Sequence, residues 1–211
     1  MKFKFHLVLL LLTTAFYAKA NYLSIGESGE TLPQGTYRIG ASLQSLTAGK
    51  SGLNIGTFLD MGGSDELSSR FLFGLGSVDF HLGGSVKYIP FPDFMNQPAI
   101  GIKASIWLAR IADTSTTAFQ ISPLISKKVD IEKGTMTPYF AVPINLVYTK
   151  SNNSTGTQFV VGTEYQHPDL ESVFFAGEFA LNLNNSESGL SLFASIPFDA
   201  NKGFQRRKKK E

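Results

Sequence analysis

Few residues of this chain have the types and spacing that catalysis requires. Two histidines, His81 and His167, lie beyond residue 20. His81 follows Asp79 by two positions, and an imidazole beside a carboxylate is the nearest approach to a general base in the chain. His167 begins the triplet His-Pro-Asp, which indicates a turn. We expect His81 to form a hydrogen bond in the protein interior and not to act as a base.

The sequence contains no pattern typical of nucleophilic catalysis or of a metal site. Serine, histidine and acidic residues are present, as acyl hydrolases need, but no spacing indicates a nucleophile activated by a base. The absence of cysteine excludes disulfides, thiolate metal sites and lipidation of a cysteine after a leader. We therefore expect no enzymatic activity, no metal and no cofactor.

The residues that could do chemistry lie in a ladder of alternating apolar and small polar residues. Turn-forming stretches such as 151–156 divide this ladder into segments, most of them close to the length of a tilted transmembrane strand. The ten segments are 35–46, 53–61, 67–76, 78–89, 98–111, 117–127, 135–149, 157–167, 172–183 and 189–198. The predicted number of strands depends on whether the stretch 67–89 is divided by a turn near 74–77. Bacterial single-chain barrels have an even number of strands, which favours ten within a range of eight to twelve.

Alternation gives each strand two unlike faces. One face is uniformly bulky and apolar, with residues such as Ile102, Leu146 and Phe179. The other face is crowded with Gly, Ala and Ser, which suit the inside of a narrow barrel. The pattern therefore predicts an apolar face turned toward lipid. A soluble lipocalin-type barrel would show the same alternation inverted and is the alternative.

Charged residues on the predicted inner face balance. Four are positive and four negative: Arg38, Arg70, Lys87 and Lys103 against Asp60, Asp79, Glu164 and Glu178. Buried charge is tolerated only when it is paired and hydrogen-bonded. We therefore predict a largely closed, salt-bridged lumen. The alternative is that these charges line a narrow aqueous pore.

Composition agrees with a membrane setting. Charged residues make up 17% of the chain, whereas soluble domains average about 25%. Aromatic side chains near the strand ends are placed as the girdles at the two membrane interfaces would be. These predicted interface aromatics are Tyr37, Tyr88, Tyr139, Tyr148, Tyr165 and Phe198. The net charge of +2 is too small to imply nucleic acid.

The ends of the chain complete the predicted organisation. Residues 1–20 form a signal peptide, with Lys2 and Lys4 before an apolar run too short to span a bilayer. Residues 21–34 are a polar, glycine-rich arm, 35–198 the barrel and 199–211 a basic tail. The tail is either solvated or binds anionic lipid headgroups or an acidic partner.

Prolines interrupt the pattern at two places. Proline cannot donate to a strand ladder, so we expect β-bulges around 138–143. The apolar, proline-rich segment 89–98 is expected to be a rigid turn. The alternatives are that it lies on the membrane interface or binds a partner.

Together the leader, the strand rhythm and the facing pattern resemble the small outer-membrane β-barrel proteins of Gram-negative bacteria, the OmpA- and OmpW-like class. The resemblance covers roughly Gly35 to Phe198. Barrels of this class finish on an aromatic that assists the insertion machinery, and Phe198 would fill that place. The chain departs from this pattern in Pro197 and in the tail from Asp199.

The resemblance implies an all-β fold, a transmembrane antiparallel up-and-down β-barrel of about ten strands. It also implies export through the periplasm to the outer membrane and a monomer in contact with outer-membrane lipid and the barrel-insertion machinery. Three functions follow: a structural or surface-interaction barrel with a closed lumen, a narrow pore or hydrophobic-solute channel in the manner of OmpW, or a soluble periplasmic barrel that binds an apolar ligand. Any small-molecule substrate is unknown.

Overall fold

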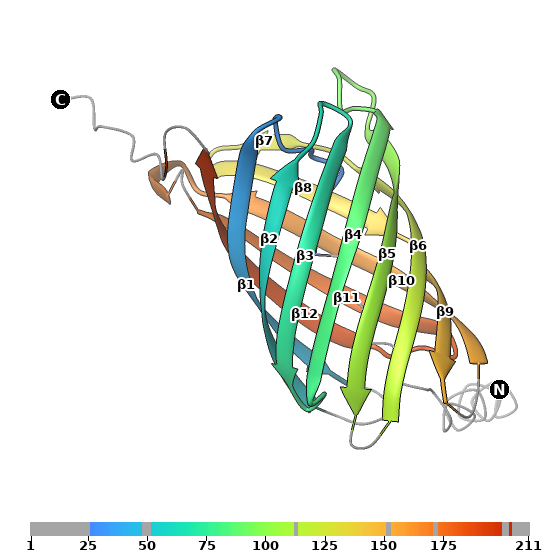
Figure 1. The fold of residues 1–211 in the computed structure, drawn as a ribbon. Helices are drawn as coiled ribbons and strands as arrows, with labels where there is room; N and C mark the ends of the chain where they lie inside the picture. The colour runs from blue at the N-terminus through green and yellow to red at the C-terminus, as the bar shows by residue number, and fades with distance from the viewer. Residues whose placement is uncertain are drawn as a thin grey trace, which may run out of the picture.

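The computed structural model describes residues 26–47, 52–111, 114–150, 153–170, 173–199 and 203. They form one antiparallel sheet that closes on itself as a barrel (Figure 1). Its strands are β1 (Thr36–Leu46), β2 (Gly52–Gly62), β3 (Leu67–Gly76), β4 (Phe80–Phe91), β5 (Ala99–Ile111), β6 (Thr114–Ser126), β7 (Val129–Ile131), β8 (Gly134–Ala141), β9 (Ile144–Thr149), β10 (Asn153–Gln166), β11 (Phe174–Asn184) and β12 (Gly189–Asp199). One 3-10 helix, η1 (Pro168–Leu170), follows β10, and no helix among the described residues is long and apolar enough to cross a membrane.

Closure comes from pairing between the first and last strands. β1 pairs with β2 on one side and with β12 on the other, along its whole length. β8 and β9 lie end to end and together occupy one strand position in the wall, because both pair with β6 and with β10. The wall therefore has ten positions, and the predicted all-β, ten-stranded antiparallel fold is confirmed.

The bulges expected around 138–143 are absent. β8 and β9 keep the same register against β10, so proline interrupts the ladder without shifting it. The backbone groups next to these prolines are hydrogen-bonded to the adjacent strands. Val142 N donates to Pro123 O at 3.1 Å, and Pro143 O accepts from Gln158 N at 3.0 Å. The register shifts lie elsewhere, between Tyr88 and Phe91 and between Thr157 and Gln158.

The two ends of the barrel differ. The terminal rim, where β1 begins and β12 ends, carries connections 63–66, 92–98, 127–133 and 167–173, with β7 and η1 among them. The turn rim, at the opposite end, carries the connections 77–79 and 185–188 and the facing ends of β1 and β2, of β5 and β6 and of β9 and β10. The predicted signal peptide lies outside the described residues, as does the predicted tail except for Asp199 and Gly203.

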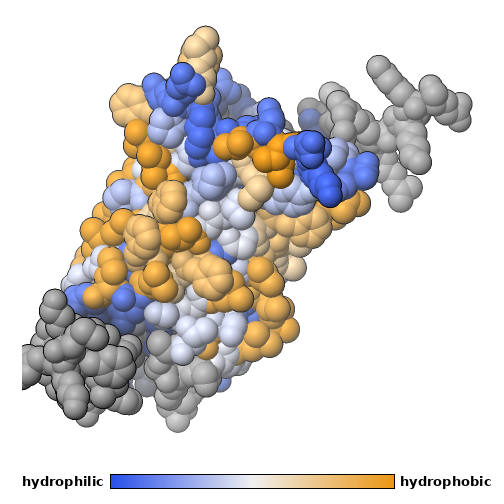
Figure 2. Space-filling model, turned by 180° about the vertical axis from the view of Figure 1, so that it is seen from behind, coloured by the Kyte–Doolittle hydropathy of each residue, from blue (hydrophilic) through white to orange (hydrophobic). Residues whose placement is uncertain are grey.

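The outer wall is apolar. Figure 2 shows hydrophobic side chains over much of the side of the barrel and hydrophilic ones gathered at the terminal rim. Single residues of the wall, such as Ile55 at 61% and Phe71 at 57%, are largely exposed. The inner face holds glycines, serines, buried charges and two clusters of apolar side chains, one around Phe58 and Trp107 and the other around Ile89 and Leu124. A soluble barrel with an apolar cavity requires the opposite facing, so the observed facing favours an apolar wall turned toward lipid.

Candidate functional site: a lumen occupied by the N-terminal arm

The structure places seven of the eight predicted lumen charges inside the barrel. Their side chains are buried or nearly so: Arg38, Asp60, Arg70, Lys87, Lys103, Glu164 and Glu178. The eighth, Asp79, is exposed in the turn between β3 and β4, so its prediction is wrong. The reason is that β4 begins only at Phe80. Val78 is the turn residue that is buried, and its N–H donates to Asn54 Oδ1 at 3.0 Å.

Residues 26–29 of the predicted arm run inside the barrel, and 30–34 reach the terminal rim. Figure 1 shows this segment passing within the wall before it turns into β1. Glu27 and Ser28 are buried, at 4% and 0% exposure. At the terminal rim, Thr36 N donates to Pro33 O at 3.0 Å and closes the turn into the first strand.

The arm's backbone donors bind side chains of the wall. Gly26 N donates to Glu178 Oε2 at 2.7 Å, and Ser28 N donates to Glu164 Oε1 at 2.6 Å. Gly29 N donates to Ser126 Oγ at 2.9 Å. This stretch belongs to no strand, and buried backbone groups need partners. Wall side chains therefore replace the ladder that a strand would have used.

Backbone carbonyls of the arm accept from cations of the wall. Arg70 Nη1 donates to Gly26 O at 3.3 Å. Lys87 Nζ donates to Ser28 O at 2.8 Å and to Glu30 O at 2.7 Å. Carboxylates of the wall thus meet N–H groups of the arm, and ammonium and guanidinium groups meet its carbonyls.

Glu27 lies at the centre of three cations. Its Oε1 is 3.7 Å from Lys87 Nζ, and its Oε2 is 3.8 Å from Arg70 Nε and hydrogen-bonded to Lys103 Nζ. Lys103 is fully buried. Coulombic attraction is strong at such sites because water does not screen it.

Glu27 also completes the charge balance. The strands contribute four cations and three carboxylates, and a further buried acid, Glu187, lies in the turn between β11 and β12. Glu27 adds a fourth carboxylate to those of the strands. We call the eight groups the lumen charge network: Glu27, Arg38, Asp60, Arg70, Lys87, Lys103, Glu164 and Glu178. Sequence reasoning missed Glu27 because segment 21–34 has no strand period. The available signal was the flanking pair of glycines in Gly26-Glu27-Ser28-Gly29.

The remaining network contacts are tight. Arg70 binds Asp60 through two bonds, Nε to Oδ1 at 2.5 Å and Nη2 to Oδ2 at 2.8 Å, and its guanidinium lies 4.1 Å from the centre of the Phe58 ring. Paired, parallel bonds of this kind are the strongest that arginine makes. Arg38 Nη1 lies 3.5 Å from Glu164 Oε2.

Glycines let the arm approach the wall. A Cβ on Gly26, whose φ is +52°, would lie 2.4 Å from Phe193 Cζ. One on Gly29 would lie 2.7 Å from Ser126 Oγ and 2.8 Å from Ala99 Cβ. No larger residue fits either place without displacement of the wall.

Tyr139 is a second correction. It was predicted at the membrane interface, but it is fully buried in the lumen and its hydroxyl donates to Glu178 Oε2 at 3.0 Å. On β8 its neighbours Pro138 and Phe140 take the outward positions, and Gly162 on β10 leaves room, since a Cβ there would lie 2.3 Å from Tyr139 Cζ.

The other predicted interface aromatics lie on the outer wall. Tyr88 and Tyr148 are exposed. Tyr37 stacks on Phe198, with ring centres 5.2 Å apart, at the seam between the first and last strands. The Tyr165 hydroxyl donates to Lys133 O. All of these except Tyr148 lie near the terminal rim.

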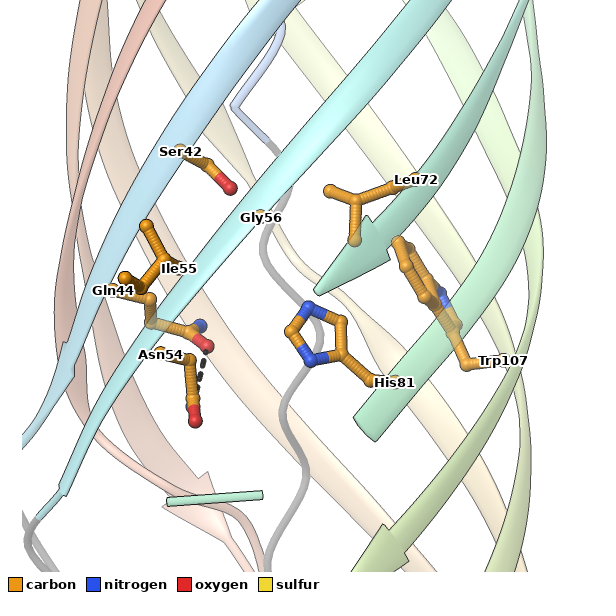
Figure 3. Close-up of a pocket in the computed structure, with 8 residues that line it drawn as sticks. All are labelled: Ser42, Gln44, Asn54, Ile55, Gly56, Leu72, His81 and Trp107. Atoms are coloured by element: carbon orange, nitrogen blue, oxygen red, sulfur yellow. Dashed lines mark hydrogen bonds between the residues drawn. The ribbon is translucent and has the colours of Figure 1, made fainter. Parts of the chain in front are cut away.

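His81 lies in the lumen without an acid beside it, and its Nδ1 has no hydrogen-bond partner among the described residues, so the structure does not show the expected hydrogen bond at this atom. Figure 3 shows its ring pointing inward near Trp107, opposite Gln44 and Asn54, whose side chains are hydrogen-bonded at 3.4 Å. These residues line a cavity of about 10 Å³ with no carboxylate in its lining. In hydrolase triads an acid orients the histidine base, and the lining of this cavity contains no such acid. The described residues also hold no group of His, Asp and Glu arranged for a metal ion.

A larger cavity, of about 190 Å³, lies between the arm and the wall at the terminal rim. Glu30, Leu32 and Lys128 are among the residues that line it. Arg38 and Phe174 also line it, with the Arg38 guanidinium 4.4 Å from the centre of the Phe174 ring.

No protein-family model and no curated protein matches the chain. Among solved structures it is similar to a bacterial polysaccharide outer membrane secretin, at 9% identity and a TM-score of 0.46, over 77% of this chain and 65% of that one. This chain thus spans less than two thirds of the secretin's length. It is also similar to the beta domain of the Bordetella autotransporter Brka, at 9% identity and a TM-score of 0.47, over 78% of this chain and 98% of that one. These values are too low for any inference about function.

Proposed function

We propose that this chain is an integral outer-membrane β-barrel protein with a structural or surface-interaction role, whose lumen is closed by its own N-terminal arm. The observation that carries the proposal is the position of Glu27, inside the lumen and bound by three cations of the wall. An open pore needs a continuous aqueous path. Here the arm backbone bonds to several strands in turn, and the charges that could line a pore bind one another.

Membrane insertion is supported by the outer wall. Residues such as Leu53 on β2, Phe73 on β3 and Leu192 on β12 are exposed. In lipid every backbone N–H and C=O needs a partner, which a closed ladder supplies. The proposed setting is the outer membrane, after export, in the OmpA- and OmpW-like class. Lipid and the insertion machinery are the proposed partners, and the protein is a monomer.

We propose no enzymatic activity. His81 has no acid beside it, and Asp79, the carboxylate nearest to it in the sequence, is exposed in a turn. A narrow pore or hydrophobic-solute channel would require the arm to leave the lumen.

Two measurements test the proposal. Membrane fractionation with gel mobility before and after boiling should recover the protein from the outer membrane only with detergent, with a band that shifts on heating. Purified protein in planar bilayers should conduct poorly. Recovery in the soluble periplasmic fraction would contradict the membrane assignment, and steady, large channels would contradict the closed lumen.

A further inference from the structure

We infer that Arg70, Lys87 and Lys103 form an anion-binding site for a small carboxylate in the barrel wall, and that Glu27 occupies this site from within the same chain. The inference deepens the proposed closure of the lumen and rests on it. The site belongs to the wall. The arm is its ligand.

The wall alone places like charges together. Lys87 of β4 and Lys103 of β5 are direct cross-strand partners, and both side chains are buried on the lumen side. Like charges directly opposite one another destabilise a sheet. Such a pair therefore needs an anion between the two ammonium groups.

Glu27 supplies that anion in a bridging geometry. One carboxylate oxygen faces Lys87 and the other binds Lys103. Arg70, on the adjacent strand β3, approaches the second oxygen at 3.8 Å while it also binds Asp60. Three neighbouring strands thus direct cations at the two oxygens of one carboxylate.

The size of the site limits its ligand. Gly26 and Gly29 hold the backbone on either side of Glu27 so close to the wall that neither could carry a Cβ. Replacement of Glu27 by alanine removes a CH₂ and a carboxylate, a group equal in size to acetate. Formate and acetate therefore fit the space that the substitution leaves, and larger dicarboxylates do not.

The test is chemical complementation of full-length Glu27→Ala protein folded in detergent. Its urea unfolding midpoint is measured in sodium chloride and in increasing sodium acetate at equal ionic strength. We expect Glu27→Ala to lose stability in chloride and to recover at least half of the loss in acetate, with saturation. Wild type and the control Glu30→Ala should show no such recovery, because Glu30 lies at the rim and its carboxylate meets Lys128 at 3.3 Å.

A folded Glu27→Ala protein whose midpoint does not respond to acetate would overturn the inference. If the variant does not fold in chloride, it should fold when acetate is present. If it folds in neither, Glu27→Ala combined with Lys87→Met, which removes one of the opposed lysines, should fold without acetate, and its failure would overturn the site. These outcomes are separate from those of the proposed function, which depend on fractionation and conductance of the wild-type protein.

Discussion

At the scale of single residues, Glu27 neutralises the cations that it contacts. The strand residues of the lumen charge network include one more cation than carboxylate, and two of the cations, Lys87 and Lys103, are directly opposed across β4 and β5. Loss of one partner from a buried ion pair costs about 3–5 kcal/mol because the other charge stays buried. A residue outside every strand therefore has a large effect on barrel stability.

Gly26→Ala should destabilise the protein for two reasons. The positive φ costs about 1–2 kcal/mol for a residue with a Cβ, and the contact with Phe193 adds about 1–3 kcal/mol of overpacking. The control is Gly35→Ala, which also has a positive φ, +76°, but has open space around its Cβ position. Urea unfolding in detergent should show a greater loss for Gly26→Ala, and equal losses would contradict the proposed contact with the wall.

Glu187 should make stability depend on pH. It is 2% exposed in the turn between β11 and β12, and burial raises its pKa from the ordinary value of 4.5 to about 7. The folded state therefore favours the protonated acid. Below pH 4.5 the group costs nothing, its cost grows as the pH rises toward 7, and above about 7 it is complete.

Unfolding midpoints measured between pH 4.5 and 7 test this. As the pH rises across this interval, wild type should lose stability relative to Glu187→Gln, because only wild type carries the acid that must ionise. Asp79→Asn, at an exposed acid of another turn at the same rim, should show no such pH-dependent difference from wild type. A difference between wild type and Glu187→Gln that stays constant with pH would contradict the prediction.

At the scale of elements, the arm differs from the strands in how its backbone is satisfied. Strands bond to neighbours through regular ladders, whereas residues 26–30 bond to side chains of β3, β4, β6, β10 and β11. Such an element depends on the finished barrel for its position. We therefore expect it to dock late in folding, after the strands have paired.

The loop 92–98 is a second element held by side chains. Lys127 Nζ binds the Asp93 carboxylate and donates to Met95 O and Gln97 O. Burial opposes ionisation of Asp93, but the bonds from Lys127 and from Lys128 N outweigh it and hold the pKa of Asp93 below its ordinary value. The loop is thus fixed through one lysine while Phe94 and Met95 stay exposed. Its interfacial or partner-binding role remains a prediction.

Lys127→Met should loosen this loop and leave the barrel intact. The expected result is faster proteolytic cleavage within 92–98 and an unchanged heat-dependent gel shift, because the lost bonds lie outside the strand ladder. Lys128→Met is the matched control, since the Lys128 side chain is half exposed and its backbone N–H to Asp93 survives. Equal cleavage of the two variants would show that Lys127 does not hold the loop.

At the scale of the whole molecule, the barrel has two unlike ends. In outer-membrane barrels with an even strand number, short turns face the periplasm and longer loops face outward. Here several of the longer connections share the terminal rim with the first and last strand ends. If the protein is inserted as proposed, strand number predicts a terminal rim in the periplasm, whereas loop length alone predicts that it faces outward.

The orientation can be measured because the chain has no cysteine. We expect Asp79→Cys at the turn rim to react with a membrane-impermeant maleimide on intact cells. Asn96→Cys at the terminal rim should react only after the outer membrane is permeabilised. Both positions are exposed, so accessibility within the fold does not separate them. The reverse labelling pattern would show that the terminal rim faces outward.

The sequence by itself determined the strands, their number and their two faces. Alternation is a local property, and side chains two residues apart share a face wherever a strand forms. That is why seven of the eight lumen charges and most interface aromatics lie on the predicted sides. The predictions for Asp79 and Tyr139 are wrong for local reasons. Asp79 lies one residue before the start of β4, and Tyr139 occupies an inward position beside Gly162.

Only the tertiary structure decided where the arm lies. Residues 26–30 have no period, and their bonds to Ser126, Glu164 and Glu178 join positions 97 to 152 residues apart. Such contacts exist only after the wall has closed, because closure brings strands from the whole chain around one axis. The sequence predicted paired charges inside the barrel, and the structure contains them. The fourth carboxylate of the lumen charge network, however, is Glu27, which lies in the arm and not in a strand.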